Sequence, residues 1–525
     1  MTDGTPVTDS RVNGRQRGQI RVSPQVITAR SPVTGAVLGQ VAVATRLQVQ
    51  DAMAEARLGR MAWDGIGLAR RLSFIRALRD ALYRQQDRII GTLVAEQGKL
   101  QQEALLEYLA TMEMVDFYVR QAERILAPQE VSVRLLPHRR HFVIRRPYGV
   151  VLVISPWNYP LYLSVGPIVA ALTAGNSVLF KPSEYATQIG EAIAGVVAEA
   201  EFPDEVFHIL HGYGEVGAMM IEAHPDHICF TGSVSTGKQI ARAAAEKLIP
   251  VTLELGGKDA AIVLHNADIE RAAAGIVWSG IFNAGQTCAS VERVYADRRI
   301  ADRLITAMKH VVEQYVQPPD GAPASLAALT TPAQRKVVES QVQEAVAAGA
   351  EVVTGGRWAA DGSPFFMPTI LTNVTPEMRI CQEETFGPVI LVVPVKDAAE
   401  AVRLSNASTF GLTASIWTED RDYGLWLAER LQTGTVSINE HLLVSGVAEM
   451  PWGGVKESGY GRTQGAEGLL GMTYSQVVTV DRFRLPRALE LFWYPYTPFK
   501  RALIRRGIHA LYGPTWRDRL RALLP

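Results

Sequence analysis

One stretch of the sequence, from Val251 to Ser290, combines a carboxylate with a thiol. Glu254 stands in Leu-Glu-Leu-Gly-Gly, and Cys288 follows it by 34 positions in Gly-Gln-Thr-Cys. A cysteine attacks carbon as the thiolate, which a local positive field favours. A glutamate can act as a general base where burial raises its pKa. The pair therefore predicts covalent catalysis at Cys288, followed by hydrolysis that Glu254 assists.

Each of these residues also has an ordinary structural interpretation. A lone cysteine is commonly a buried structural residue, and a glutamate at the end of a strand is commonly an exposed acid. Cys288 is followed by two small residues, Ala289 and Ser290, which predicts an accessible position. Glu254 lies among apolar residues of a short segment, which predicts burial and a raised pKa.

The elements that would position such residues form an alternating pattern after Tyr148. Short apolar segments alternate with Ala-rich helical segments, which predicts a parallel sheet with helices on its faces. Asn158 and Lys181 follow the first two strands, at the edge where such sheets bind ligands. Residues 258–440 show further alternation, which predicts a second sheet. The strands expected first are 150–154, 177–180 and 206–210, with helices at 163–174 and 187–201.

Two glycine-rich segments resemble phosphate-binding loops. Residues 212–217 match GxGxxG after a strand, but the helix that follows is too short for a full βαβ unit. Residues 232–238 nearly match a P-loop, yet Gln239 stands where a magnesium-binding Ser or Thr is needed. A better interpretation is that Gly232 and Ser233 open a helix whose free N–H groups face a dinucleotide pyrophosphate.

Taken together, seven motifs resemble the NAD(P)-dependent aldehyde dehydrogenase superfamily over roughly residues 28 to 482. Each motif alone is weak, but the set occurs in the family's order and is specific. The motifs are PWNYP (156–160), FKPSE (180–184), FTGS (230–233), ELGGK (254–258), GQTC (285–288), EETFGP (383–388) and PWGGVKESG (451–459).

The resemblance implies a role for each catalytic residue. Cys288 would attack the aldehyde, and Asn158 would hold the oxyanion with its side-chain amide, although sequence alone favours a turn role for Asn158. Hydride would pass to the nicotinamide and leave a thioester, which water activated by Glu254 would hydrolyse. The presence of Glu254 argues against the CoA-acylating branch. No metal is implied.

The resemblance also implies the cofactor site. Lys181 and Glu184 would bind the adenosine ribose. A carboxylate at this position favours NAD as the cofactor, and the resemblance also allows NADP. The other implied cofactor contacts are Ser155, Pro156, Trp157, Gly214, Gly217, Phe230, Thr231, Gly232, Ser233, Leu255, Gly256, Glu384 and Phe386.

The expected fold class is α/β and similar to the aldehyde dehydrogenases. It has two doubly wound parallel-sheet domains, a small β element for oligomerisation and a C-terminal helical tail. The resemblance implies a homodimer or homotetramer. The expected boundaries are a disordered arm at 1–22, an NAD-binding domain at 23–128 and 148–255, an oligomerisation element at 129–147 and 473–482, a catalytic domain at 256–457, a return segment at 458–472 and a tail at 483–525.

The composition of the chain argues against several classes of protein. The chain has 53 Lys and Arg and 53 Asp and Glu, so its zero net charge gives no argument for nucleic-acid binding. Its three cysteines are widely spaced, which argues against disulfides or a zinc site and favours a cytoplasmic protein. No uncharged stretch of 18 apolar residues occurs, so no membrane-spanning helix is expected.

The C-terminal tail departs from this neutral balance. Residues 481–525 hold ten Lys or Arg and three Asp or Glu, about +7. Thr497, Pro498 and Gly513 predict the start and end of a helix. Such a basic amphipathic helix is compatible with membrane contact. It is also compatible with closing an apolar substrate tunnel, as the C-terminal helices of fatty aldehyde dehydrogenases do. The third interpretation is a helix that docks on the protein itself or on a neighbouring subunit. Its expected apolar face is Phe499, Leu503, Ile508 and Leu511.

Residues around the nucleophile indicate the substrate. Leu161, Tyr162, Leu163 and Gly166 follow the PWNYP motif, and small residues flank Cys288. This favours a medium-chain, long-chain or aromatic aldehyde, with a semialdehyde such as succinate semialdehyde as the alternative. A catalytically silent relative would lack one of the catalytic side chains, and all are present.

Overall fold

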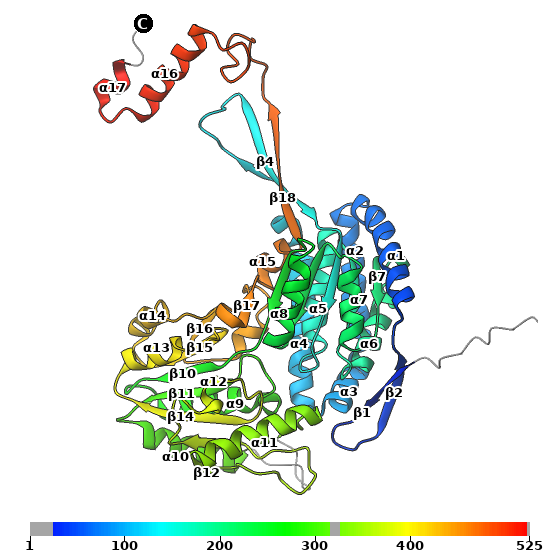
Figure 1. Cartoon of the computed structure of the whole chain (residues 1–525), viewed down its shortest axis with the longest axis vertical. Helices are drawn as coiled ribbons and strands as arrows, with labels where there is room; N and C mark the ends of the chain where they lie inside the picture. The colour runs from blue at the N-terminus through cyan, green and yellow to red at the C-terminus, as the bar shows by residue number, and fades with distance from the viewer. Residues whose placement is uncertain (1–24, 316–325, 522–525) are drawn as a thin grey trace, which may run out of the picture.

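The computed structural model describes residues 25–315 and 326–521. The arm expected at 1–22 lies outside the described residues. Two sheets with their helices form the body, and a narrow β element carries the C-terminal tail away from it (Figure 1). All three cysteines are free thiols.

The first sheet has six strands in the order β17-β9-β8-β5-β6-β7. All neighbours pair in parallel except β17, which joins the edge antiparallel to β9. The predicted alternation of strands and helices is confirmed here. The elements are β5 (Val150–Ile154), α5 (Tyr162–Ala174), β6 (Ser177–Lys181), α6 (Thr187–Glu199), η1 (Asp204–Val206), β7 (Phe207–Ile209), α7 (Gly214–Glu222), β8 (His227–Thr231), α8 (Val234–Ala245), β9 (Val251–Glu254) and β17 (Gly459–Tyr460).

The second sheet has seven strands in the order β12-β13-β14-β11-β10-β15-β16, and only β12 is antiparallel to its neighbour. Its elements are β10 (Asp259–Val263), α9 (Ile269–Ile281), η2 (Phe282–Gly285), β11 (Val291–Asp297), α10 (Ala301–Tyr315), α11 (Pro332–Ala347), β12 (Glu351–Thr354), β13 (Thr369–Thr372), α12 (Arg379–Gln382), β14 (Val389–Val395), α13 (Ala398–Asn406), β15 (Thr413–Trp417), α14 (Arg421–Ala428) and β16 (Thr435–Ile438), followed by η3 (Leu443–Gly446), η4 (Lys456–Ser458) and α15 (Gly465–Leu470).

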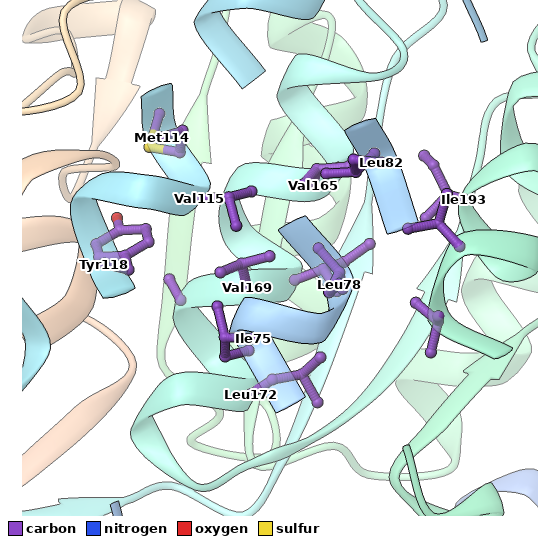
Figure 2. Close-up of a cluster of buried hydrophobic side chains, with 14 of the residues drawn as sticks. Ile75, Leu78, Leu82, Met114, Val115, Tyr118, Val165, Val169, Leu172 and Ile193 are labelled. Carbon is purple, nitrogen blue, oxygen red and sulfur yellow. The ribbon is translucent and has the colours of Figure 1, made fainter. Parts of the chain in front are cut away.

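Four N-terminal helices cover the first sheet. They are α1 (Arg46–Gly65), α2 (Leu68–Arg84), α3 (Gln86–Gln97) and α4 (Gln101–Leu126). The sequence predicts helix α2 from Leu68, Leu72, Ile75, Leu78 and Leu82, which repeat at helical spacing. This is confirmed, because Ile75, Leu78 and Leu82 are buried against α4 and α5 (Figure 2). Burying one such side chain stabilises the fold by about 1.5–3 kcal/mol. The helices therefore act as a scaffold for the strand ends.

The sequence predicts a hairpin at residues 31–46 with Thr34 and Gly35 at its turn, but the hairpin of the structure lies earlier in the chain. Its strands are β1 (Val26–Arg30) and β2 (Val37–Ala42), so the expected bounds were wrong although the turn holds Gly35 as expected. The reason is a competing helix start. Thr45 caps α1 by accepting the N–H of Gln48, whose side chain bonds back to Thr45 N–H. The chain is therefore helical where the second strand was expected to end.

The third sheet joins two segments far apart in sequence. It has the order β18-β4-β3, from β3 (Gln129–Val131), β4 (Arg139–Pro147) and β18 (Thr473–Asp481). β18 runs antiparallel to β4 over its whole length. The predicted pairing of these segments is confirmed. The sheet projects from the body (Figure 1), and its edge strand β18 exposes Val477, Val478 and Val480.

Beyond β18 the tail forms α16 (Pro498–Tyr512) and α17 (Trp516–Arg521), away from both large sheets (Figure 1). The predicted helix start and end are confirmed, because Thr497 caps α16 and Gly513 follows it. The predicted single apolar face is wrong. Phe499 and Ile508 are exposed, whereas Leu503 and Leu511 are half-buried. No described helix is both long enough and apolar enough to span a bilayer.

Candidate active site

Cys288 lies on the loop between η2 and β11 and lines a cavity of about 290 Å³. Its side chain is neither fully buried nor exposed. Burial raises the pKa of the Cys288 thiol, and the nearby carboxylates of Glu384 and Glu254 raise it further. The thiol therefore keeps its proton at neutral pH until a base or a bound cation changes this balance.

A strained and anchored loop positions this thiol. Asn283 and Ala284 have φ of 56° and 55°, the left-handed region. The buried side chain of Gln286 donates to the carbonyls of Asn283 and Ala328 and accepts the N–H of Thr330. These three bonds fix the loop just before Cys288. The motif GQTC thus needs its glutamine for structure.

The structure brings Asn158 to this loop. Its side chain is buried, and Nδ2 donates to the carbonyl of Gln286 at 3.0 Å. The side chain of Asn283 in turn donates to the carbonyl of Asn158 at 3.1 Å. An amide nitrogen carries two hydrogens, so the bond to Gln286 leaves one N–H for another acceptor. Next to it, the Tyr159 hydroxyl lies 2.7 Å from Thr287 Oγ1, directly before the nucleophile.

Glu254 ends β9 and is 5% exposed. The interpretation as an exposed acid is therefore wrong, and the predicted burial is right. Burial raises the pKa of Glu254 to about 8, against the opposing effects of Arg462 and Thr463. Among the described residues, none bonds its Oε1. A buried carboxyl with this pKa can take a proton near neutral pH.

Glu254 does not line the Cys288 cavity directly. It lines a smaller cavity of about 30 Å³, which is enough for a water molecule. Three residues, Tyr162, Leu163 and Gln464, line both cavities, so the two adjoin. Thr231, Thr252 and Thr463 add polar groups around the smaller one. Glu254 thus lines a water-sized space that shares three lining residues with the Cys288 cavity.

Gly232 and Gly256, at the strand ends of the first sheet, leave backbone without side chains of its own, and we call this pair the glycine cradle. A Cβ at Gly232 would lie 2.5 Å from the Phe230 ring, and one at Gly256 would lie 2.3 Å from the carboxylate of Glu384. Thr231 precedes Gly232 at the end of β8. Ser233 then caps α8 by accepting the N–H of Thr236 at 3.3 Å, which leaves earlier N–H groups of the helix for a ligand. This cradle fits a pyrophosphate approached by backbone.

Lys181 and Glu184 lie at the neighbouring strand end. Lys181 is buried, and burial lowers its pKa while Glu184 opposes the shift. Its Nζ donates to the carbonyl of Pro182 at 3.2 Å. Gly217 packs on its side chain, since a Cβ there would be 3.5 Å from Lys181 Cδ. Gly214 only begins α7, and a Cβ at Gly214 would meet open space.

The remaining expected contacts meet at the same edge. The N–H of Ser155 donates to the carbonyl of Lys181. Pro156 and Trp157 follow β5, and the Trp157 ring packs edge-to-face on Phe386 with centroids 5.6 Å apart. Leu255 is buried and packs against Gly237 of α8, so it shapes the cradle from behind.

Glu384 faces the cradle from the second sheet. Its Oε1 accepts the N–H of Gly257 at 3.0 Å. Burial, and then the charge of Glu292, raises the pKa of Glu384 to about 8. Sequence reasoning missed Glu292, which accepts the N–H groups of Thr385 and Phe386 and contacts the buried Lys258. The only signal in the sequence for this contact of Glu292 was Lys258, the lysine of the ELGGK motif.

A buried ion pair under the PWNYP turn was also missed. The side chains of Lys99 and Glu107 contact each other and are both fully buried. Glu107 Oε1 accepts the N–H groups of Leu161 and Tyr162 at 2.9 and 3.2 Å, at the start of α5. Lys99 Nζ lies 3.9 Å from the centroid of the Tyr159 ring. The pair therefore supports the turn that carries the site's amide and hydroxyl.

Glu103, in the first turn of the same helix α4, supports the loop before Cys288. Its carboxylate accepts the N–H of Asn283 at 2.7 Å and that of Leu100 at 3.1 Å. Glu103 and Glu107 are four residues apart on α4, which places them on one face of the helix, and Lys99 lies just before its start. The four-residue spacing of Lys99, Glu103 and Glu107 was the available signal, since three ionisable side chains are hard to bury together without a purpose.

We expect Glu107→Gln to lower the free energy of unfolding by about 3–5 kcal/mol, because it leaves the buried Lys99 without its anionic partner. Urea denaturation followed by circular dichroism measures this. Glu113→Gln is the matched control, on an exposed position of the same helix, and it should change stability by less than about 0.5 kcal/mol. Equal midpoints for the two variants would contradict the supporting role.

The profile of the Aldehyde dehydrogenase family matches residues 21–478. The chain belongs to this family. It is 38% identical over 492 residues to the "4,4'-diapolycopene aldehyde oxidase" of Methylomonas sp, covering 93% of this chain and 91% of the relative. It is 37% identical over 452 residues to a "Putative succinate-semialdehyde dehydrogenase [NADP(+)]" of Mycolicibacterium smegmatis, covering 86% and 87%.

A solved aldehyde dehydrogenase from Mycobacterium tuberculosis, complexed with NAD+, superposes with a TM-score of 0.83 at 32% identity. The match covers 88% of this chain and 96% of that one. The expected aldehyde dehydrogenase-like fold is confirmed. The chain is an oxidoreductase that acts on aldehydes and uses NAD(P), because solved relatives hold NAD+ or NADP. The names of these relatives give different substrates, so family membership alone leaves the substrate open.

Proposed function

We propose that the chain oxidises an extended apolar aldehyde to its carboxylic acid. The observation that carries this is the lining of the Cys288 cavity. Among the described residues that line it, none is Lys, Arg or His, and the charged ones are Glu107 and Glu113. A substrate carboxylate would find no cation in this lining, because Glu107 is already paired with the buried Lys99 and the other charged residue is the acid Glu113. The apolar remainder of the lining suits a hydrocarbon chain or ring.

The mouth of this cavity is apolar as well. Leu106, Leu109, Trp278 and Leu443 line it and keep 37%, 56%, 38% and 63% of their surface exposed. Exposed large apolar side chains grouped at a pocket mark a binding surface. An aldehyde longer than the cavity could therefore keep apolar contact as it leaves the protein. The Methylomonas relative, named for a polyene aldehyde, supports this proposal.

Semialdehyde oxidation is the second candidate, and the Mycolicibacterium relative favours it. Its carboxylate would need a cationic anchor that the cavity lining of this chain lacks among the described residues. A site that buries an unpaired charge loses several kcal/mol relative to one that pairs it. We therefore rank the apolar aldehyde first.

The roles we assign to the residues follow their positions. Cys288, as the thiolate, attacks the aldehyde carbon, and Asn158 donates its second amide hydrogen to the oxyanion. NAD(P), when bound in the glycine cradle, supplies the hydride acceptor. Glu254 takes a proton from the water that hydrolyses the thioester on Cys288. Its position beside a water-sized cavity supports this assignment.

The cofactor preference follows from one carboxylate. Burial lowers the pKa of Lys181, and Glu184 lies close enough for its charge to oppose this shift. A carboxylate there accepts from the hydroxyls of an adenosine ribose and repels a 2′-phosphate. We propose that NAD is preferred over NADP, with Lys181 and Glu184 as the ribose contacts. Glu384 and Phe386 would contact the nicotinamide end from the second sheet.

The projecting β element supports a homo-oligomer. Its edge strand β18 leaves its backbone unpaired on one side and exposes Val477, Val478 and Val480. Such an edge pairs readily with another chain unless it is covered. We propose that a second copy covers it.

The test of the substrate proposal is kcat/KM across straight-chain aldehydes and succinate semialdehyde, with NAD and NADP. We expect kcat/KM to rise about fourfold per methylene while the chain fills the cavity, since each buried CH2 contributes about 0.8 kcal/mol. Trp278→Ala should reduce the value for long chains and leave propanal unchanged. A preference for succinate semialdehyde over the apolar aldehyde of equal length would overturn the proposal.

A further inference from the structure

The C-terminal tail carries an exposed apolar surface outside the family match, which ends at residue 478. Single exposed apolar residues are ordinary, but a group of them marks an interaction site. We call this group the tail surface. Its aromatic members are Phe483, Phe492, Trp493, Tyr494, Tyr496, Phe499, Tyr512 and Trp516, with 54–74% of each side chain exposed.

This exposure belongs to a folded segment. Thr497 caps α16, and the buried Lys500 donates from Nζ to the carbonyl of Trp493 at 2.8 Å. Arg519 Nε donates to the carbonyl of Gly513 at 2.8 Å, which ties α17 back to the end of α16. The inner face of α16, which carries Lys500, thus packs on the rest of the tail. The outer face is left for a partner.

The outer face is cationic. Arg501, Arg505 and Arg506 are exposed and line an open groove with His509, Ile504 and Ile508. One acid, Asp518, also lines the groove and accepts a bond from Thr515. Over residues 482–521 the sequence holds ten Lys or Arg against two Asp or Glu, in a chain of zero net charge. The positive charge is therefore concentrated in the same segment of the chain as the exposed aromatic rings.

We propose that the tail surface docks on an anionic lipid bilayer. Arginines near such a surface meet phosphates, and Trp and Tyr rings favour the interface between headgroups and acyl chains. The attachment is peripheral, since no described helix is long and apolar enough to span the bilayer. Lipid fits better than a second copy of the tail, because a twofold contact would set the two cationic faces against each other.

The position of the tail allows this docking. It lies beyond the far end of the three-stranded sheet, away from both large sheets (Figure 1). It contacts that sheet at two places: Arg134 donates to the carbonyl of Leu511 at 3.4 Å and lies 5.8 Å from the Tyr512 ring, and the His138 ring lies 6.3 Å from that of Phe483. A bilayer could therefore reach the tail surface without covering the Cys288 cavity of the same chain. The proposal stands whichever aldehyde is the substrate.

The test is co-sedimentation of the full chain with vesicles of phosphatidylcholine alone or mixed with phosphatidylglycerol in equal parts. We expect binding to the mixed vesicles that weakens as salt is raised. The triple variant Arg501→Gln, Arg505→Gln, Arg506→Gln should bind them about one hundred-fold more weakly, since each arginine near an anionic surface contributes a factor of about five. The variant Trp493→Ser, Trp516→Ser should reduce the binding that persists at high salt.

A matched control removes the same charge elsewhere. Arg76, Arg298 and Arg303 are exposed on the body, and their triple Gln variant should bind vesicles like the native chain. Turnover of propanal in solution verifies that every variant is folded. Equal binding by the two triple variants, or no binding to mixed vesicles at low salt, would overturn the proposal. Loss of binding accompanied by a change of oligomeric state in gel filtration would also overturn it, and would assign the tail surface to a second copy.

Discussion

Replacing Cys288 with alanine should reduce aldehyde-dependent NADH formation by about 10⁵-fold or more. Loss of a nucleophile removes the covalent route altogether, and comparable substitutions in other enzymes that form covalent intermediates have effects of this size. NADH formation is followed by near-UV absorbance. NAD binding, followed by tryptophan fluorescence, should persist, because the glycine cradle around Gly232 and Gly256 lies on other elements.

A second cysteine of this chain supplies the control. Cys381 is also a free, half-buried thiol, and burial raises its pKa as it does for Cys288. It lines a different cavity with Arg293 and Tyr295. Cys381→Ala should therefore keep turnover within about twofold. If both variants kept turnover, Cys288 would be a structural thiol and the covalent mechanism would be wrong.

Local signals in the sequence predicted most of the fold. The alternation after Tyr148 follows from short apolar runs and helix spacing, and it gave both sheets. Thr497 and Pro498 set the start of the tail helix and Gly513 sets its end, and the effects of these residues act within one turn. The first hairpin was misplaced because Thr45 belongs to a capping box rather than to a strand. Whether a strand or a helix forms at such a boundary depends on the residues on both sides of it.

The tail shows where a local pattern fails. Phe499 and Leu503 suggest one apolar face, but Leu503 is half-buried and Phe499 is exposed. The direction of a helix face is decided by what packs on it, here the buried Lys500 and the chain around Trp493. Sequence spacing does not contain that information.

The candidate site was predictable as a set of residues and not as an arrangement. Cys288, Asn158 and Glu254 could be named from motifs, yet their supports come from distant parts of the chain. Glu107 holds the turn after Asn158 from a helix more than fifty residues earlier. Gln464, nearly two hundred residues after Cys288, lies between the two cavities. Such contacts arise from tertiary packing and leave no mark in local spacing.

Glu254→Gln should separate the two halves of the reaction. Steady-state turnover should fall by about 10²–10⁴-fold, the usual contribution of a general base. A first turnover should remain, seen as a burst of one NADH per Cys288, because formation of the thioester does not require Glu254 in the assigned mechanism. Rapid mixing with near-UV detection measures the burst. A variant with no burst would instead assign Glu254 to the deprotonation of Cys288, whose pKa is raised.

The pH dependence gives this assignment a second test. Burial raises the pKa of Glu254 to about 8, and the base acts as the carboxylate. The active fraction therefore falls tenfold per pH unit below about 8 and is complete above it, so kcat should rise to a plateau through that value. Glu96 is a second buried glutamate with a raised pKa, about 7, but it only accepts N–H groups at the start of α6. Glu96→Gln should keep the native pH profile and show no burst, which separates loss of a base from loss of a buried carboxyl.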